Sequence, residues 1–169
     1  LQSAISAVEM ALWDIKGKYY NAPVYELLGG RVRDRVRMYA NGWFSGAREP
    51  EDFAKAALAA KEKGVTALKW DPFGSAYMFM DAQQFSHSIE IVEAVRGAVG
   101  SSVDLLIEGH GRFDIATGIK IANALKPFDP YFFEEPTPPD SLDAMAEVRR
   151  KSPVPIAGGE RIYSLTQFK

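Results

Sequence analysis

The feature that most constrains the fold is a repeated alternation of short apolar runs with longer amphipathic segments from Val36 onward. Short apolar runs that alternate with helical patterns predict βαβ units, in which helices cover a parallel sheet. The fold class is therefore predicted to be α/β. The five expected strands comprise residues 36–43, 66–71, 103–108, 130–135 and 155–159. The expected helices comprise residues 50–63, 81–97, 114–126 and 140–151, with the start of another at 164–169.

Two architectures accommodate such a series, an open doubly wound sheet and part of a closed barrel. An open sheet that binds a dinucleotide has a glycine-rich loop after its first strand, and no such loop follows residues 36–43. A complete eightfold barrel needs roughly 250 residues, whereas this chain has 169 and stops in mid-pattern. We therefore expect a partial (β/α) barrel of the TIM type, with about five βα units in residues 36–169.

The beginning of the chain has a different pattern and is assigned to a separate region, residues 1–35. Apolar side chains recur at helical spacing in residues 3–20, which predicts a helix with Ser3 as its N-cap. A short helical turn is expected at 24–28, before two glycines. The chain does not begin with methionine, so we expect that residues upstream of Leu1 are missing.

Composition argues against several classes of function. The formal net charge is −2, without the basic surplus that nucleic-acid-binding proteins use to neutralise phosphates. The absence of cysteine excludes disulfides, thiolate catalysis and zinc–thiolate sites. No apolar run approaches the roughly 18–20 residues that cross a bilayer, and no signal peptide is recognisable. We expect a cytoplasmic protein that binds neither nucleic acid nor membranes.

Three carboxylates stand at the ends of successive predicted strands. Glu134 follows Glu108 by 26 residues, and Glu160 follows Glu134 by the same interval. Since each βα unit advances by one strand, the equal spacing predicts that all three lie on the C-terminal rim, where barrel active sites form. Clustered carboxylates repel one another, and a hard cation with oxygen ligands, such as Mg²⁺, relieves the repulsion. The alternative is three separate acids, each paired with a lysine or arginine.

The segments around these acids resemble the enolase superfamily, and most closely its mandelate racemase and muconate lactonizing enzyme branch. Residues 7–18 resemble the helix that precedes the barrel, and residues 23–30 resemble the link that follows that helix. Glu134-Glu135-Pro136 and Gly159-Glu160 resemble the second and third metal-ligand motifs. The resemblance implies an α+β capping domain that ends within residues 1–35. It also implies Mg²⁺ that binds a substrate carboxylate while a base removes the neighbouring proton.

Two positions depart from the pattern of that family. Its first metal ligand is usually aspartate, whereas Glu108 is longer by one methylene, about 1.5 Å. Its second strand usually ends Lys-x-Lys, and the second lysine is the base of the racemases. Here the segment reads Lys69-Trp70-Asp71, and Asp71 cannot replace an ammonium group. Ordinary racemase chemistry is therefore not expected.

His110 indicates a different reaction. Positions two apart share a face of a strand, so Glu108 and His110 are both expected to face the site. An imidazolium can donate a proton to a leaving hydroxide. His110-Gly111-Arg112 resembles the sugar-acid (galactonate-type) dehydratases of the branch, in which this histidine is the general acid for β-elimination of water. The alternative is a histidine that is only hydrogen-bonded in a loop.

Four more charged residues near the predicted strand ends have candidate roles. Lys69 is expected to contact the substrate carboxylate or orient the metal site, and a rim ion pair with Asp71 or Glu108 is the alternative. Asp71 and Arg112 are assigned to substrate binding, and Arg161 could similarly clamp a substrate acid.

The resemblance thus implies part of a Mg²⁺-dependent carbon–oxygen lyase that dehydrates an acid sugar. It also implies a general base on a later strand, a histidine supported by an aspartate, so the chain itself is expected to be inactive. A racemase, epimerase or cycloisomerase of the same superfamily is one alternative, and a non-catalytic partial barrel is another. Five strands leave two open sheet edges and expose Leu106, Phe132 and Ile156, so homo-oligomers are expected.

Overall fold

The chain falls into two units in a computed structural model that describes residues 1–168. The first unit, Leu1–Arg37, contains α1 (Gln2–Tyr19) and α2 (Val24–Leu27), and the second unit begins at Met38. The prediction of Ser3 as an N-cap is wrong, because α1 begins one residue earlier and its N-cap position is Leu1. No helix within residues 1–168 combines the length and the apolar character needed to span a bilayer.

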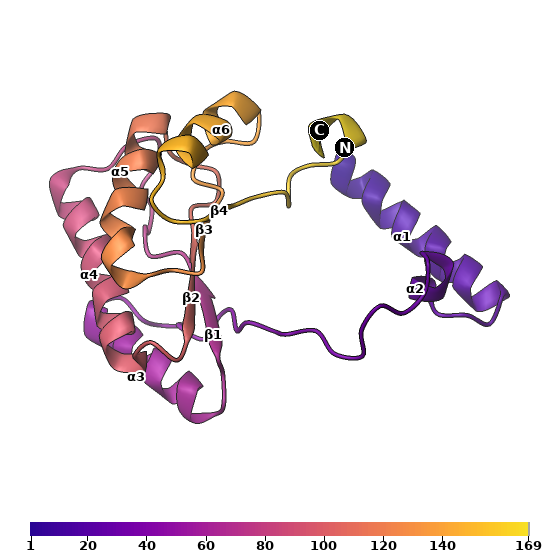
Figure 1. Cartoon of the computed structure of the whole chain (residues 1–169), viewed down its shortest axis with the longest axis horizontal. Helices are drawn as coiled ribbons and strands as arrows, with labels where there is room; N and C mark the ends of the chain where they lie inside the picture. Colours follow the sequence, from indigo (N-terminus) through magenta and orange to yellow (C-terminus); the bar gives the residue numbers. More distant parts are fainter. Residues whose placement is uncertain (169) are drawn as a thin grey trace. The chain divides into compact units, whose positions relative to one another are not determined.

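The second unit is organised around a sheet of parallel strands (Figure 1). The order in the sheet follows the order in the sequence, as expected when each strand is followed by a helix that returns the chain to the same end. The predicted α/β class is confirmed. The four strands are β1 (Ala67–Trp70), β2 (Asp104–Glu108), β3 (Phe132–Glu134) and β4 (Ile156–Ala157).

The helices of this unit begin with side chains that cap their free N–H groups. Asp81 accepts a hydrogen bond from the backbone of Gln84 at 2.8 Å, and Asp114 accepts one from Thr117 at 2.7 Å. The α-helices are α3 (Pro50–Glu62), α4 (Ala82–Val99), α5 (Ile115–Leu125) and α6 (Leu142–Lys151). The 3₁₀ segments are η1 (Lys126–Phe128) and η2 (Leu165–Phe168). The helix expected at 164–169 is only η2, and Lys169 lies outside the described residues.

The main hydrophobic core lies between the sheet and helices α3, α4 and α5, which cover one face of the sheet (Figure 1). Alternate strand residues point to opposite faces, so one set of side chains enters this core and the other set lines the opposite face. The strand residues in the core are Leu68, Trp70, Leu105, Ile107 and Phe133. On the opposite face, the residues in register across β2 and β3 include the carboxylate pair Glu108 and Glu134.

The predicted strand at residues 36–43 is wrong, so the described sheet has four strands and not five. Only Ala40 pairs with β1, through two backbone hydrogen bonds of 2.9 Å. The side chains of Val36 and Met38 are left exposed, and Gly42 turns the chain with φ of 71°. A segment at a sheet edge has a neighbour on one side only, and the turn ends the pairing after one bridge.

The prediction that Leu106 is exposed is also wrong, because the residue is only 4% exposed. Leu106 lies on an inner strand, in register with Lys69 on one side and Phe132 on the other. Neighbours on both sides cover it without any further strand. Phe132 and Ile156, nearer the β4 edge, are partly buried.

Arg96 ties the end of α4 to the segments that flank β2 and β3. Its guanidinium donates hydrogen bonds to the carbonyl oxygens of Gly100 at 2.7 Å and Val103 at 2.8 Å. It also donates to Phe128 at 2.9 Å and Asp129 at 3.2 Å. Carbonyl groups at helix ends and turns have no partner within their own element, so one arginine satisfies four of them and fixes three segments together.

Replacement of Arg96 by methionine is predicted to lower the free energy of unfolding by about 2–4 kcal/mol, because the four carbonyl oxygens lose a charged donor. Arg150→Met is the matched control, since within residues 1–168 Arg150 makes only an exposed ion pair with Glu147, which is worth about 0–1 kcal/mol. Urea denaturation of the three proteins measures the difference. Equal midpoints for the two variants would contradict the structural role of Arg96.

Candidate active site

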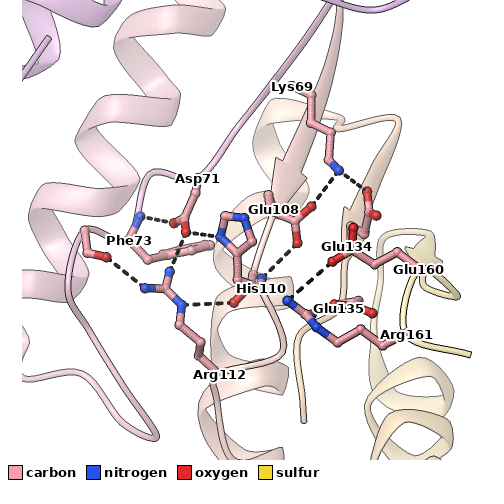
Figure 2. Close-up of polar contacts among 12 residues, drawn as sticks. Lys69, Asp71, Phe73, Glu108, His110, Arg112, Glu134, Glu135, Glu160 and Arg161 are labelled. Carbon is pink, nitrogen blue, oxygen red and sulfur yellow. Dashed lines mark hydrogen bonds and ion pairs between the residues drawn. The ribbon is translucent and has the colours of Figure 1, made fainter. Parts of the chain in front are cut away.

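An ammonium group lies between two buried carboxylates at the carboxyl ends of the first three strands. The Nζ of Lys69 is 2.6 Å from Oε2 of Glu108 and 2.7 Å from Oε2 of Glu134 (Figure 2). The three side chains are 8%, 5% and 14% exposed, in the order Lys69, Glu108, Glu134. Burial opposes the charged form of Lys69, but hydrogen bonds to the two carboxylates outweigh it and raise the pKa of Lys69.

The second oxygen of Glu108 is also engaged. Its Oε1 accepts a hydrogen bond of 2.8 Å from the backbone N–H of His110. This hydrogen bond ties the Glu108 side chain to the loop that follows β2. Both oxygens of Glu108 have partners, so the residue tolerates its burial with a negative charge.

Glu160 is not part of this group. The sequence predicted that its strand extends to residue 159, but β4 ends at Ala157. The side chain of Glu160 is 51% exposed and lies 3.3 Å from Nη2 of Arg161. Across residues 1–168, no three histidine or acidic side chains are close enough together to hold a metal ion. The structure brings together two of the three predicted ligands, with Lys69 between them.

The donor set nevertheless fits a hard divalent cation. Glu108 and Glu134 supply only oxygen atoms, which Mg²⁺ prefers. With Lys69 charged, the three side chains of Lys69, Glu108 and Glu134 carry a net charge of −1, and their burial limits the access of water. The two carboxylates already share one cationic group, so the place between them suits positive charge.

A second polar group surrounds Asp71, which directly follows β1. Its Oδ2 lies 2.6 Å from Nδ1 of His110 and 2.6 Å from Nη2 of Arg112 (Figure 2). Its Oδ1 accepts a hydrogen bond of 2.9 Å from the backbone N–H of Phe73. Sequence analysis did not anticipate this pairing, because Asp71 and His110 are 39 residues apart and come together only through the pairing of β1 with β2.

Strand alternation was the basis for expecting His110 on the same face as Glu108, but β2 ends at Glu108. His110 has a φ of 53°, in the left-handed region, so the alternation does not continue to it. The imidazole ring meets Asp71, and the side chain is 50% exposed.

Gly109 allows the loop after β2 to lie against the loop after β3. Its N–H donates to the carbonyl of Glu134 at 2.8 Å, and the N–H of Gly111 donates to that of Glu135 at 2.7 Å. A Cβ at Gly109 would lie 2.7 Å from the carbonyl oxygen of Glu135, too close for any other residue type. Sequence analysis missed Gly109, although a glycine directly after a strand-end acid was visible.

Glu135 forms an ion pair with Arg161, which had been a candidate clamp for a substrate acid. The Glu135 side chain is only 3% exposed, so its negative charge needs a partner. Arg161, in the turn after β4, supplies the positive charge that pairs with Glu135. Its second terminal nitrogen is near Glu160. The guanidinium is therefore held by the protein itself.

Most of the chain matches one family. Residues 52–169 match the family described as enolase C-terminal domain-like, and residues 1–29 match the mandelate racemase/muconate lactonizing enzyme N-terminal domain.

The chain is similar to named dehydratases and to a solved structure of the enolase superfamily. The chain is 45% identical to a D-gluconate dehydratase of Thermoproteus tenax, covering 96% of this chain and 33% of the relative. It is 42% identical to a D-gluconate/D-galactonate dehydratase of Picrophilus torridus, covering 98% of this chain and 42% of the relative. A crystal structure of an enolase superfamily member from Salmonella Typhimurium superposes with a TM-score of 0.90 at 30% identity, covering 99% of this chain and 47% of that one. The chain thus spans less than half the length of these relatives.

Replacement of Lys69 by methionine is predicted to lower the free energy of unfolding by about 3–5 kcal/mol at pH 7, because two buried carboxylates lose their shared counter-charge. Urea denaturation at pH 7 measures the loss. Lys63→Met, at an exposed position at the end of α3, is the control and should change stability by less than about 0.5 kcal/mol. A loss in Lys69→Met equal to that of the control would contradict the account of this site.

Proposed function

The chain belongs to the enolase C-terminal domain-like family, within the mandelate racemase and muconate lactonizing enzyme branch of the enolase superfamily, and on that premise we propose that it is part of an acid-sugar dehydratase. The observation that carries the proposal is the position of His110, an imidazole two residues beyond a buried carboxylate. The names of the relatives support it, since they act on gluconate and galactonate.

In this proposal the second unit is part of a (β/α) barrel that a longer protein completes, and residues 1–35 are the end of an α+β capping domain. Four parallel strands in sequence order, with helices on one face, support the barrel. The match of residues 1–29 to the N-terminal domain of the branch supports the capping domain. Assembly into homo-oligomers and a cytoplasmic location stay predictions.

Glu108, Glu134 and Glu160 would hold Mg²⁺, with Glu160 brought in from the turn after β4. Two buried carboxylates around one cationic group support this assignment. The bound ion would stabilise the negative charge that develops on a substrate carboxylate when the neighbouring carbon loses its proton. Lys69 would then be free to turn its ammonium group toward that carboxylate.

His110 would act as the general acid. Loss of water from an acid sugar removes a proton from the carbon beside the carboxylate and a hydroxide from the next carbon. His110 would give a proton to that hydroxide, so that water leaves and a 2-keto-3-deoxy acid results after tautomerisation. The base that removes the carbon-bound proton would come from a part of the protein beyond this chain, so the chain alone is expected to be inactive.

One observation favours a function of another class. Glu160 is apart from the other two acids, and the ammonium of Lys69 already lies between those two, as expected if this chain were a partial barrel without catalysis. The activity and metal-binding experiments separate the two possibilities.

Acid sugars incubated with the full-length protein are predicted to yield 2-keto-3-deoxy products. In His110→Asn the rate of water loss should fall by about 10²–10⁴-fold, while exchange of the proton beside the carboxylate with solvent continues. His87→Asn is the control, because His87 lies on α4, and it should retain activity. Exchange without any loss of water in the unaltered protein would instead indicate a racemase or epimerase.

Mg²⁺ titrated into the chain in a calorimeter is predicted to bind Glu134→Gln roughly tenfold or more weakly than the unaltered chain, since one charged ligand is lost. Glu62→Gln, at an exposed position of α3, should bind as the unaltered chain does. Equal affinities for all three proteins would remove Glu134 from the site, and the absence of any binding heat would favour the non-catalytic alternative.

A further inference from the structure

We propose that Asp71 is a positioning residue for His110, which it holds with the proton on Nδ1 so that Nε2 is the nitrogen presented to a ligand. Arg112 in turn holds Asp71 in place. The proposal rests on the proposed function only in taking His110 as the group that meets the substrate. It gives Asp71 and Arg112 roles different from the direct substrate binding that the sequence suggested.

The contact between Asp71 and His110 determines where the imidazole proton lies. Oδ2 of Asp71 is 2.6 Å from Nδ1 of His110 (Figure 2), a short distance typical of hydrogen bonds that involve a charged group. An ionised carboxylate can only accept hydrogen bonds, so Nδ1 must be the donor. In a neutral imidazole the other nitrogen, Nε2, then carries the lone pair, and in an imidazolium it carries the second proton.

Asp71 is itself immobile enough to orient a ring. It directly follows β1, whose four residues are all buried, so its backbone is fixed by the sheet. The side chain is 15% exposed and receives two further hydrogen bonds, from the backbone of Phe73 and from Arg112. Three donors on one carboxylate leave it a single orientation.

Arg112 makes the link between Asp71 and two loops. Besides Asp71, its guanidinium donates to the carbonyl of Gly74 at 2.8 Å, in the loop after β1. It also donates to the carbonyl of Gly109 at 3.2 Å, in the loop after β2. All three guanidinium nitrogens therefore have partners within the protein, which suits support of Asp71 better than capture of a substrate acid.

The backbone under the ring is fixed as well. His110 and Gly111 have consecutive positive φ values of 53° and 62°, and their N–H groups donate to Glu108 Oε1 at 2.8 Å and to the carbonyl of Glu135 at 2.7 Å. Within the described part of the chain, Nε2 of His110 takes part in no hydrogen bond, and half of the side chain is exposed. Nε2 is thus the one position on the ring left for a ligand.

Nitrogen-15 NMR of the histidine side chains tests the proposal directly, because the chain has only two histidines, His87 and His110. At a pH about two units above the ordinary histidine pKa of about 6.5, His110 of the unaltered chain should show the tautomer protonated on Nδ1. In Asp71→Ala the signals should shift toward the tautomer protonated on Nε2, while His87 stays unchanged as the internal reference. Asp140→Ala, at an exposed loop position, is the matched control and should leave both histidines unchanged.

Two outcomes of this experiment overturn the proposal. One is a His110 protonated on Nε2 in the unaltered chain, a measurement that does not depend on whether any variant folds. The other is a His110 spectrum that Asp71→Ala leaves unchanged. The NMR measurement needs no catalytic activity, so its result stands even if the full-length protein does not dehydrate acid sugars. Failure of the positioning role can therefore be distinguished from failure of the proposed dehydratase function.

In the full-length protein, Asp71→Asn should lower kcat about 10–100-fold with little change in KM, as expected for loss of a group that orients another. A higher KM with an unchanged kcat would instead return Asp71 to substrate binding and overturn the positioning role.

Discussion

The interaction on which the site depends is the ammonium of Lys69 between the carboxylates of Glu108 and Glu134. The register of β2 and β3 sets these two acids side by side, on the face of the sheet opposite the hydrophobic core. Two buried negative charges at such close range need a cation. The sheet therefore requires positive charge at this point, and Lys69 supplies it from β1.

The same arrangement recurs along the rim. Asp71 after β1 pairs with Arg112 from the loop after β2, and Glu135 after β3 pairs with Arg161 from the turn after β4. Asp71 and Glu135 are thus each paired with a cation from a neighbouring segment, and these ion pairs tie adjacent loops together. In contrast to these paired side chains, His110 is half exposed, and its Nε2 is free to contact a substrate.

Much of this could be predicted because it depends on local pattern. The alternation of apolar runs and amphipathic segments located four strands and the helices between them. The 26-residue spacing located Glu108 and Glu134, which lie in register on neighbouring strands. What could not be predicted depends on non-local geometry. Residues 36–43 lack a second neighbour, Glu160 lies beyond the early end of β4, and the ring of His110 pairs with a residue 39 positions away.

The central claim is that the space between Glu108 and Glu134 is a site for positive charge that a metal ion can take over from Lys69. Its most direct test is a crystal structure of the protein grown with Mn²⁺, whose anomalous scattering locates the ion without ambiguity. We predict an ion about 2.0–2.2 Å from carboxylate oxygens of Glu108 and Glu134, with Nζ of Lys69 moved out of the space between them. An ion bound elsewhere, or a Lys69 that still bridges the two carboxylates in the presence of saturating metal, would contradict the account.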